Sequence, residues 1–173
     1  MGFRSRHSLS DIHTTNTIHI CIFGIYLSPK SLVVEFSSVT VSFFVHATED
    51  AERLISAVSS RLGLEAGDLQ QETVEGYHGN QIISAKAHVI GQRALVLGNR
   101  LLQDLSTKSK KRLISELEKS MDEHDALYLR LDRQTINNEL AFSDEEPIRV
   151  KLKPKLRVGG RTAVKKGYLE LIE

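Results

Sequence analysis

The sequence predicts an α+β fold, with helices packed on one face of a mostly antiparallel or mixed β-sheet. Some segments alternate apolar and polar residues, as half-buried strands do, and others repeat apolar residues every three or four positions, as amphipathic helices do. They follow one another in the order β-α-β-β-α-α-β-α-β, which indicates a layer of helices on a sheet. A chain of 173 residues, 40% of them hydrophobic, can bury one core, so we expect a single domain whose second sheet face is uncovered.

The regular pattern begins at Val39. In VTVSFFVH, residues 39–46, alternate residues are apolar, which predicts a half-buried strand. Thr48 is the candidate N-cap of a helix whose apolar stripe ends at Gly63, a residue type that commonly stops helices. The remaining elements are two strands, two helices, a strand, a short helix capped by Asp132 and a last strand: about 69–75, 81–89, 94–105, 113–121, 127–131, 132–140 and 148–158.

Residues 1–38 differ from the rest, and we expect them to be a flexible or spurious N-terminal extension of the domain at 39–173. They show no sustained period, so they should add nothing to the core. An alternative is that translation starts downstream, near Val33, Val34 or Val39. The apolar run Ile18–Leu27 is far shorter than the roughly 20 residues that cross a bilayer, so no membrane contact is predicted. Cys21 is the only cysteine and cannot form an intrachain disulfide, which fits a cytoplasmic protein.

The sequence carries no catalytic signature. It has no Walker loop, no G-x-S-x-G elbow, no H-E-x-x-H motif and no paired cysteines, so we predict no enzyme activity, cofactor or metal. The remaining acid–base candidates are His46 with Glu49 and His124 with Asp125. A histidine beside acids at the end of a strand is more often a capping or surface residue, so these pairs do not change the prediction.

Charge is divided unevenly along the chain. Residues 39–146 hold 12 Lys and Arg against 18 Asp and Glu, a net charge of −6, whereas residues 147–173 hold 8 against 2, a net charge of +6. Such asymmetry points to an anionic partner for the basic segment, either elsewhere in the protein or outside it. The segment IRVKLKPKLRV, residues 148–158, places a cation at every second position of an extended chain: Arg149, Lys151, Lys153, Lys155 and Arg157.

These five cations form the first candidate binding site, and the ligand that they favour is a polyanion such as a nucleic acid. Their spacing is comparable with that of phosphates along an extended single strand, and five charges of one sign repel one another unless a partner is present. Pro154 cannot donate a ladder hydrogen bond, so the strand is expected either to lie at a sheet edge, open to a ligand, or to end near residue 153. The alternative is that the cations pair with the acidic part of the protein.

Three further groups are candidates for RNA contact. The cations of KSKKR stand in the first turn of a helix, where they oppose its dipole, so they indicate either a phosphate seat or a solvated helix start. Two residues of the loop EGYHGN are candidates for base stacking in addition to a turn, and in LYLRL an aromatic residue shares a strand face with a cation. The residues concerned are Lys108, Lys110, Lys111 and Arg112; Tyr77 and His78; and Tyr128 and Arg130.

Three stretches of the sequence are similar to a known family. FVHATED (44–50), EGYHGN (75–80) and LYLRLDRQ (127–134), in this order and at these intervals, resemble archaeal RNA-binding proteins that are predicted exosome subunits. The resemblance covers about 39–153 and implies a ribosomal protein L-five-like fold, an RNA partner and an association with the exosome or the ribosome. The Gly159-Gly160 region departs from the charged C-terminal helix expected of the family.

Two hypotheses of different classes follow. In the first, the protein is a non-catalytic RNA-binding module that uses its uncovered sheet face and basic C-terminal segment. In the second, it is an interaction subunit, a homodimer or a complex adaptor, whose basic segment pairs with an acidic protein surface. Salt-dependent RNA binding by the monomer favours the first hypothesis, and a salt-sensitive dimer without RNA affinity favours the second.

Overall fold

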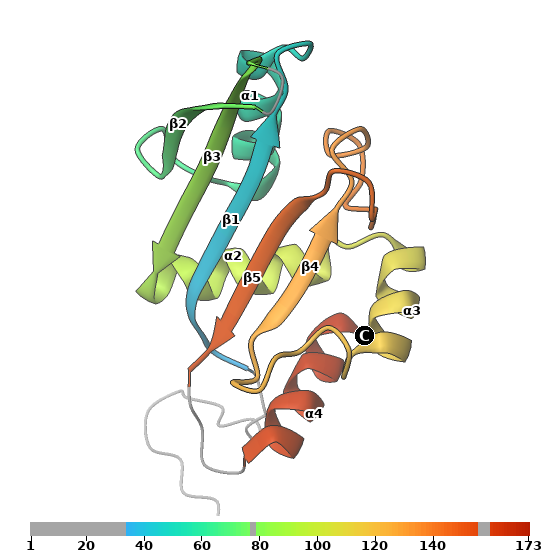
Figure 1. Ribbon diagram of the computed structural model, residues 1–173. Coiled ribbons are helices and arrows are strands. Elements are labelled where there is room, and N and C mark those ends of the chain that lie inside the picture. Colours follow the sequence, from blue (N-terminus) through green and yellow to red (C-terminus); the bar gives the residue numbers. More distant parts are fainter. Residues whose placement is uncertain (1–33, 77–78, 156–159) are drawn as a thin grey trace, which may run out of the picture.

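The computed structural model describes residues 34–76, 79–155 and 160–173, so the predicted N-terminal extension lies, up to residue 33, outside the described residues. Five strands form one sheet in the order β2-β3-β1-β5-β4, and all neighbouring strands are antiparallel. Figure 1 shows α1 and α2 passing behind this sheet, with α3 next to β4. The predicted α+β fold is therefore confirmed. The elements are β1 (Phe36–Val45), α1 (Ala51–Leu62), β2 (Leu69–Glu75), β3 (Gln81–Ile90), α2 (Gly91–Gln103), α3 (Thr107–Glu116), β4 (Leu127–Leu131), β5 (Ile148–Pro154) and α4 (Gly160–Ile172).

The alternation of the strands sorts side chains onto two faces of the sheet. On β1, Val39, Val41, Phe43 and Val45 are buried, and β4 and β5 likewise bury every second residue. The helices cover this apolar face, so the core lies between the sheet and the helices. We call the opposite side the open face. It consists of Ser38, Thr40, Ser42 and Phe44 of β1; Gln70, Glu72 and Val74 of β2; Ile82, Ser84, Lys86, His88 and Ile90 of β3; Tyr128 and Arg130 of β4; and Arg149, Lys151 and Lys153 of β5.

The core begins earlier than the sequence predicts. β1 starts at Phe36, and both Val34 and Phe36 are buried. The Phe36 ring stacks on Tyr168 of α4, with ring centroids 6.1 Å apart. The expectation that residues before Val39 add nothing to the core is therefore wrong for these two residues. The register of β1 against β5 shifts between Phe36 and Ser38, and this irregularity interrupts the alternation from which the start was predicted.

α1 begins at a different cap from the predicted one. Asp50, and not Thr48, accepts a hydrogen bond from the backbone amide of Arg53, at 3.0 Å. Residues 46–49 form a turn closed by a backbone hydrogen bond of 2.9 Å, so Thr48 lies outside the helix. The helix ends as predicted at Gly63, whose φ of 69° is in the left-handed region.

The segment 132–140 is not helical. Asp132 accepts a hydrogen bond from the amide of Gln134 at 2.8 Å, and the residues that follow form consecutive turns. Ile136 and Leu140 are nevertheless buried, which accounts for the apolar spacing that suggested a helix. Apolar residues spaced three or four positions apart can thus be buried by consecutive turns as well as by a helix.

A C-terminal helix, α4, is present although the Gly159-Gly160 region of the sequence argued against one. It begins at Gly160, whose φ of 65° is the left-handed conformation that glycine adopts at little cost. Tyr168 anchors the helix: its side chain is fully buried, and its hydroxyl donates a hydrogen bond to the backbone oxygen of Asp125 at 3.0 Å. Burial raises the pKa of Tyr168, so the hydroxyl stays neutral and remains a donor.

β5 lies inside the sheet and not at its edge. It pairs with β1 on one side and with β4 on the other, so the expectation that an edge position exposes its cations is wrong. The second alternative holds, because the strand ends at Pro154, which has no amide hydrogen to continue the ladder. The cations of β5 are accessible for another reason: they point to the open face.

Gly98 provides a test of the packing between α2 and β1. A methyl group added to Gly98 would overlap the Phe36 ring, with ring atom Cε2 only 2.8 Å away. Replacing a helical glycine by alanine ordinarily stabilises by about 1 kcal/mol. Here we expect the opposite sign, a loss of about 1–3 kcal/mol in the free energy of unfolding, because the core is overpacked. Urea denaturation measures the change. Gly67→Ala is the control, since nothing lies within 4 Å of its added methyl, and equal stability of the two variants would contradict this packing.

Candidate nucleic-acid interface

The open face gathers cations from three strands. β5 contributes alternate residues of its basic segment, as predicted, and β4 contributes Arg130. β3 adds Lys86, which was not predicted as a site residue. β1, which lies between β3 and β5, presents small hydroxyl side chains over most of its length. The face therefore has a low central strip with cations on both sides: Lys86 on β3, Arg149, Lys151 and Lys153 on β5, and Arg130 on β4.

Three of these cations stand in one line across the sheet. Lys86 lies opposite Ser42, and Ser42 lies opposite Arg149. On its other side Arg149 lies directly opposite Arg130. Neighbouring strands are about 4.8 Å apart, so this cationic row of Lys86, Arg149 and Arg130 spans roughly 15 Å. Like charges directly opposite each other destabilise a sheet, so the row favours the binding of an anion.

Acidic neighbours balance the row only in part. Asp144 lies 3.7 Å from the Arg130 guanidinium, whose side chain is 64% exposed. Within the described part of the chain, Lys86 and Arg149 form no ion pair with a carboxylate. Two of the three charges are therefore left to solvent or to a ligand.

Lys151 is held by a small network next to the row. Its Nζ lies 4.8 Å from the centroid of the Tyr128 ring and 3.4 Å from Asp122 Oδ2. The Tyr128 hydroxyl donates a hydrogen bond to the same carboxylate oxygen at 3.1 Å. The Tyr128 hydroxyl and Asp122 together raise the pKa of Lys151, so it stays charged. The predicted pairing of Tyr128 and Arg130 on one strand face is present, but Tyr128 contacts Lys151 across the ladder.

The other cations of the predicted segment divide into three cases. Lys153 is exposed on the open face, and no ion pair is found for it among the described residues. Lys155 follows the end of β5, and its Nζ lies 3.6 Å from Glu35 Oε2. Arg157 falls outside the described residues. Of the five predicted cations, Arg149, Lys151 and Lys153 therefore lie on the open face of β5, and Lys155 is paired with an acid of the same chain.

The KSKKR cluster lies on α3, at the side of the sheet. Its N-cap is Ser106, whose Oγ accepts a hydrogen bond from the amide of Ser109 at 3.3 Å and donates one to the hydroxyl of Ser109 at 3.0 Å. Ser109 is buried and accepts a hydrogen bond from the amide of Phe142 at 3.0 Å. The cap therefore uses one of the amides that a phosphate seat would need. Lys108, Lys110 and Lys111 form no ion pair among the described residues.

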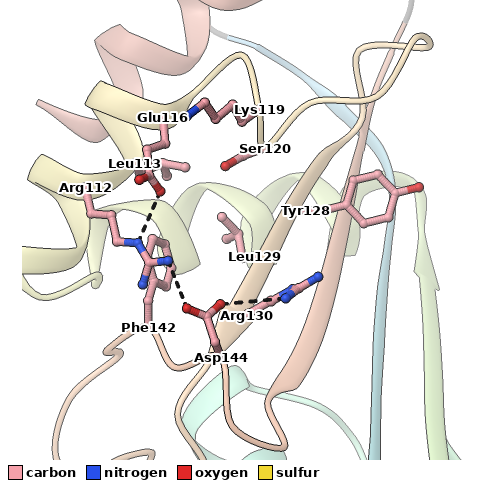
Figure 2. A pocket seen from close by; sticks show the side chains of 10 residues that line it. All are labelled: Arg112, Leu113, Glu116, Lys119, Ser120, Tyr128, Leu129, Arg130, Phe142 and Asp144. Carbon is pink, nitrogen blue, oxygen red and sulfur yellow. Dashed lines mark hydrogen bonds and ion pairs between the residues drawn. The ribbon is translucent and has the colours of Figure 1, made fainter.

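Arg112, the last cation of that cluster, lines a pocket of about 240 Å³ at the outer side of β4. Its guanidinium lies 3.2 Å from Glu116 and 3.1 Å from Asp144. Figure 2 shows Asp144 between Arg112 and Arg130, so one carboxylate joins the helix cluster to the strand cation. Tyr128 lines the same pocket but points away from Arg112. The structure thus brings two of the predicted groups together, although acids partly neutralise their charge.

The loop candidates Tyr77 and His78 fall outside the described residues. The flanking residues form the predicted connection between β2 and β3: the amide of Gly76 donates to the oxygen of Asn80 at 2.7 Å, and Gly79 has a φ of 74°. The turn role of this loop is therefore present, and its stacking role stays a prediction.

The two histidine–carboxylate pairs do not form as candidate acid–base pairs. The His46 ring contacts Glu146 at 2.9 Å, whereas Glu49 accepts a hydrogen bond from the His46 backbone amide. His124 contacts Glu123 at 3.6 Å on an exposed loop. In the part of the chain that the structure describes, no cluster of three or more His, Cys, Asp or Glu could hold a metal ion. In the same part, no helix is long and apolar enough to span a membrane.

A family model described as RNA binding matches residues 38–154. The chain belongs to this RNA-binding family. A curated relative, RNA-binding protein PAB1135 from Pyrococcus abyssi, is 30% identical over 146 residues, which cover 79% of this chain and 93% of the relative. The family match spans nearly the same part of the chain as the resemblance from the sequence, and it includes all of the sheet except the first two residues of β1.

Solved structures of archaeal proteins share the fold. Protein AF2318 from Archaeoglobus fulgidus, of the DUF54 family, is 27% identical with a TM-score of 0.64; the match covers 80% of this chain and 99% of that one. Mth689 from Methanothermobacter thermautotrophicus, also a DUF54 protein, is 24% identical with a TM-score of 0.64 over 80% of this chain and 98% of that one. The ribosomal protein L-five-like relationship implied by the sequence stays a prediction.

Asp122 makes the interface sensitive to acid. Burial alone would raise the pKa of Asp122, but hydrogen bonds from the Ala126 and His124 amides and the Tyr128 hydroxyl, together with Lys151, hold that pKa below its usual range. A depressed folded-state pKa adds stability above the unfolded pKa of about 3.9, and this stability is lost as the pH falls through the folded pKa.

We therefore expect Asp122→Asn to lower the free energy of unfolding by about 1 kcal/mol at pH 7. The difference from the wild type should shrink below about pH 4, where the wild-type carboxyl is being protonated. Urea denaturation at pH 7 and pH 3 measures it. Glu123→Gln is the control, because the Glu123 side chain is 87% exposed, and a deficit of Asp122→Asn that is independent of pH would argue against the charged network.

Proposed function

We propose that this protein is a non-catalytic RNA-binding protein that holds single-stranded RNA on the open face of its sheet. Membership in the RNA-binding family and the name of the Pyrococcus abyssi relative support an RNA partner. The observation that carries the location is the cationic row, in which Arg149 and Arg130 face each other across the ladder. This arrangement lowers the stability of the free sheet, and a bound phosphate between the two guanidinium groups relieves the repulsion.

The short side chains along β1 leave room on the open face for a nucleic-acid backbone. Ser42 separates Lys86 from Arg149, and Thr40 is the next outward residue of the same strand. Short hydroxyl side chains let a sugar–phosphate chain approach the sheet, and hydroxyls donate hydrogen bonds to phosphate oxygens. Lys153 extends the cationic surface beyond the row, so phosphates along and across β5 can be contacted.

Tyr128 offers an aromatic surface beside the phosphate contacts. Its side chain is 45% exposed on the open face, two residues before Arg130 on the same strand. Single-stranded RNA binders commonly stack bases on such aromatic side chains next to cations. The contact of Tyr128 with Lys151 keeps that ring in place, so the ring and the cation form one binding unit.

We further propose that the bound RNA places the protein in a cytoplasmic RNA-processing or ribosomal assembly. The support for this proposal is the resemblance of its motifs to predicted exosome subunits. Isolation of the protein from its native cells with its bound nucleic acid and protein partners is the test. Recovery of exosome or ribosome components together with RNA would support it, and RNA without such components would leave only RNA binding.

The second candidate function is that of an interaction subunit. The pairing of Lys151 with Asp122 and of Lys155 with Glu35 favours it, because cations of the basic segment meet carboxylates of the same chain. Another copy or another subunit could offer the same chemistry. A dimer that dissociates in salt and has no affinity for RNA would support this function instead.

The salt dependence of RNA binding tests the location of the site. Each phosphate contact to single-stranded RNA contributes about 0.7 to the slope of log K against log salt. Replacing Lys86 and Arg149 together by Gln should therefore flatten the slope by about 1.4 and weaken all sequences alike. Fluorescence anisotropy with a short uridine oligomer over a range of salt concentrations measures the slope.

The matched control removes two cations from the helix layer. Arg53 of α1 and Lys166 of α4 are exposed, and their joint replacement by Gln changes the net charge by the same amount. Its slope should stay that of the wild type. If both double variants flatten the slope equally, binding depends on net charge and not on the open face.

A further inference from the structure

A hollow of about 370 Å³ opens on the same sheet face, beside the middle of the cationic row and toward the end of β1. Its lining includes Phe44 and Ser42 of β1, Ser84 of β3, and Pro147 and Arg149 at the start of β5. A volume of this size is near the lower end of the range for small-molecule pockets, about 300–1,000 Å³. The hollow therefore suits a single planar group and not an extended segment.

Phe44 provides an aromatic surface in this hollow. Its side chain is 47% exposed, because the alternation of β1 directs this position to the open face. The residue opposite it on β3 is Ser84, and the outward residue two positions before it is Ser42. Neither side chain is large enough to cover the ring. A large aromatic side chain that is left uncovered among serines is available for stacking.

The backbone under Phe44 is held in place by Arg133. One terminal nitrogen of Arg133 donates a hydrogen bond to the Phe44 backbone oxygen at 2.6 Å. The other lies 2.8 Å from both carboxylate oxygens of Glu49 and 3.2 Å from Glu146. The Arg133 side chain is only 9% exposed, so its position is fixed by packing as well as by charge. Phe44 is thus part of a preorganised surface.

Backbone strain occurs at the rim of the hollow. Glu146 has a φ of 41°, which is unfavourable for a residue with a side chain and more so before a proline, here Pro147. Its carboxylate contacts the His46 ring at 2.9 Å and Arg133 at 3.2 Å, and these contacts hold the strained residue. Strain of this kind persists only where the surrounding structure maintains it, and it is concentrated at functional sites.

We propose that this hollow binds one unpaired base of the RNA strand, stacked on Phe44, while Arg149 at its rim contacts an adjacent phosphate. The inference rests on the proposed function, because the strand must already lie on the cationic row. Arg149 belongs to both sites, which places the hollow one nucleotide away from the row. A base is the occupant that the chemistry favours, since it is planar, stacks on an aromatic ring and brings a phosphate to the arginine.

The experiment compares two strands that carry the same phosphates. One is a hexamer of uridines, and the other is a hexamer of the same length built from a stable abasic analogue. Phe44→Ala should weaken binding of the uridine strand by roughly 5- to 150-fold, the range for loss of one stacking contact, and leave binding of the abasic strand unchanged. Arg149→Gln should weaken both strands, because it removes a phosphate contact.

Two further variants and two further measurements sharpen the result. Phe44→Tyr keeps the ring and should bind as the wild type does. Ile90→Ala is the matched control, because Ile90 is 65% exposed and apolar on the same face but lies near the other end of β3. Ile90→Ala should change neither the affinity for the uridine strand nor the affinity for the abasic strand. The salt slope of Phe44→Ala should equal that of the wild type, since the ring carries no charge, and circular dichroism establishes that each variant is folded.

The outcomes separate the two proposals. If Phe44→Ala weakens the uridine and abasic strands equally, or weakens neither, the base subsite is wrong, while an intact effect of Arg149→Gln keeps RNA on the open face. If Ile90→Ala weakens the uridine strand as much as Phe44→Ala does, exposed apolar area and not stacking accounts for the loss, and the subsite is again overturned. If the wild-type protein binds neither strand, both proposals fail.

Discussion

One constraint governs the structure: five strands share a single covered face. Since the helices lie on one side only, every strand must turn its apolar residues to that side, and the antiparallel ladders then fix which polar residues become neighbours on the other. Lys86, Arg130 and Arg149 are far apart in the sequence, yet they form one line because each alternates with a buried neighbour. The cationic row is thus a direct consequence of how the core is built.

The excess of cations near the C-terminus is partly neutralised by acids of the same chain and partly left exposed. Part of it is internal, because basic residues near the C-terminus meet acids of the preceding segments: Lys151 with Asp122, Lys155 with Glu35, Arg161 with Asp125, and Lys165 with Glu118. Part of it remains on the open face, at Arg149 and Lys153. The two hypotheses raised by the sequence therefore describe different residues of one segment: among its described residues, Lys151 and Lys155 meet acids, whereas Arg149 and Lys153 form no ion pair and point to the open face.

Much of the fold could be predicted from periodicity, whereas the site could be predicted only in part. Alternation located β4 and the start of β5 because burial on one face imposes it directly. Lys86 was missed because its approach to Arg149 depends on strand order and register, which a single strand pattern does not contain. Phe44 was missed because an apolar residue at an outward position looks like an ordinary strand residue. Thr48 was predicted as the N-cap of α1, but the cap lies at Asp50 because residues 46–49 form a turn in which Glu49 also binds the distant Arg133.

The stacking of Phe36 on Tyr168 joins the first strand of the domain to its last helix. During synthesis, a nascent chain that has reached only β5 possesses all five strands but lacks the ring that covers Phe36 and the hydroxyl that binds the Asp125 oxygen. Its apolar face is then incompletely covered at the α4 end. This end of the core can therefore close only after α4 has been synthesised and has left the ribosome, so the five strands alone do not complete the domain.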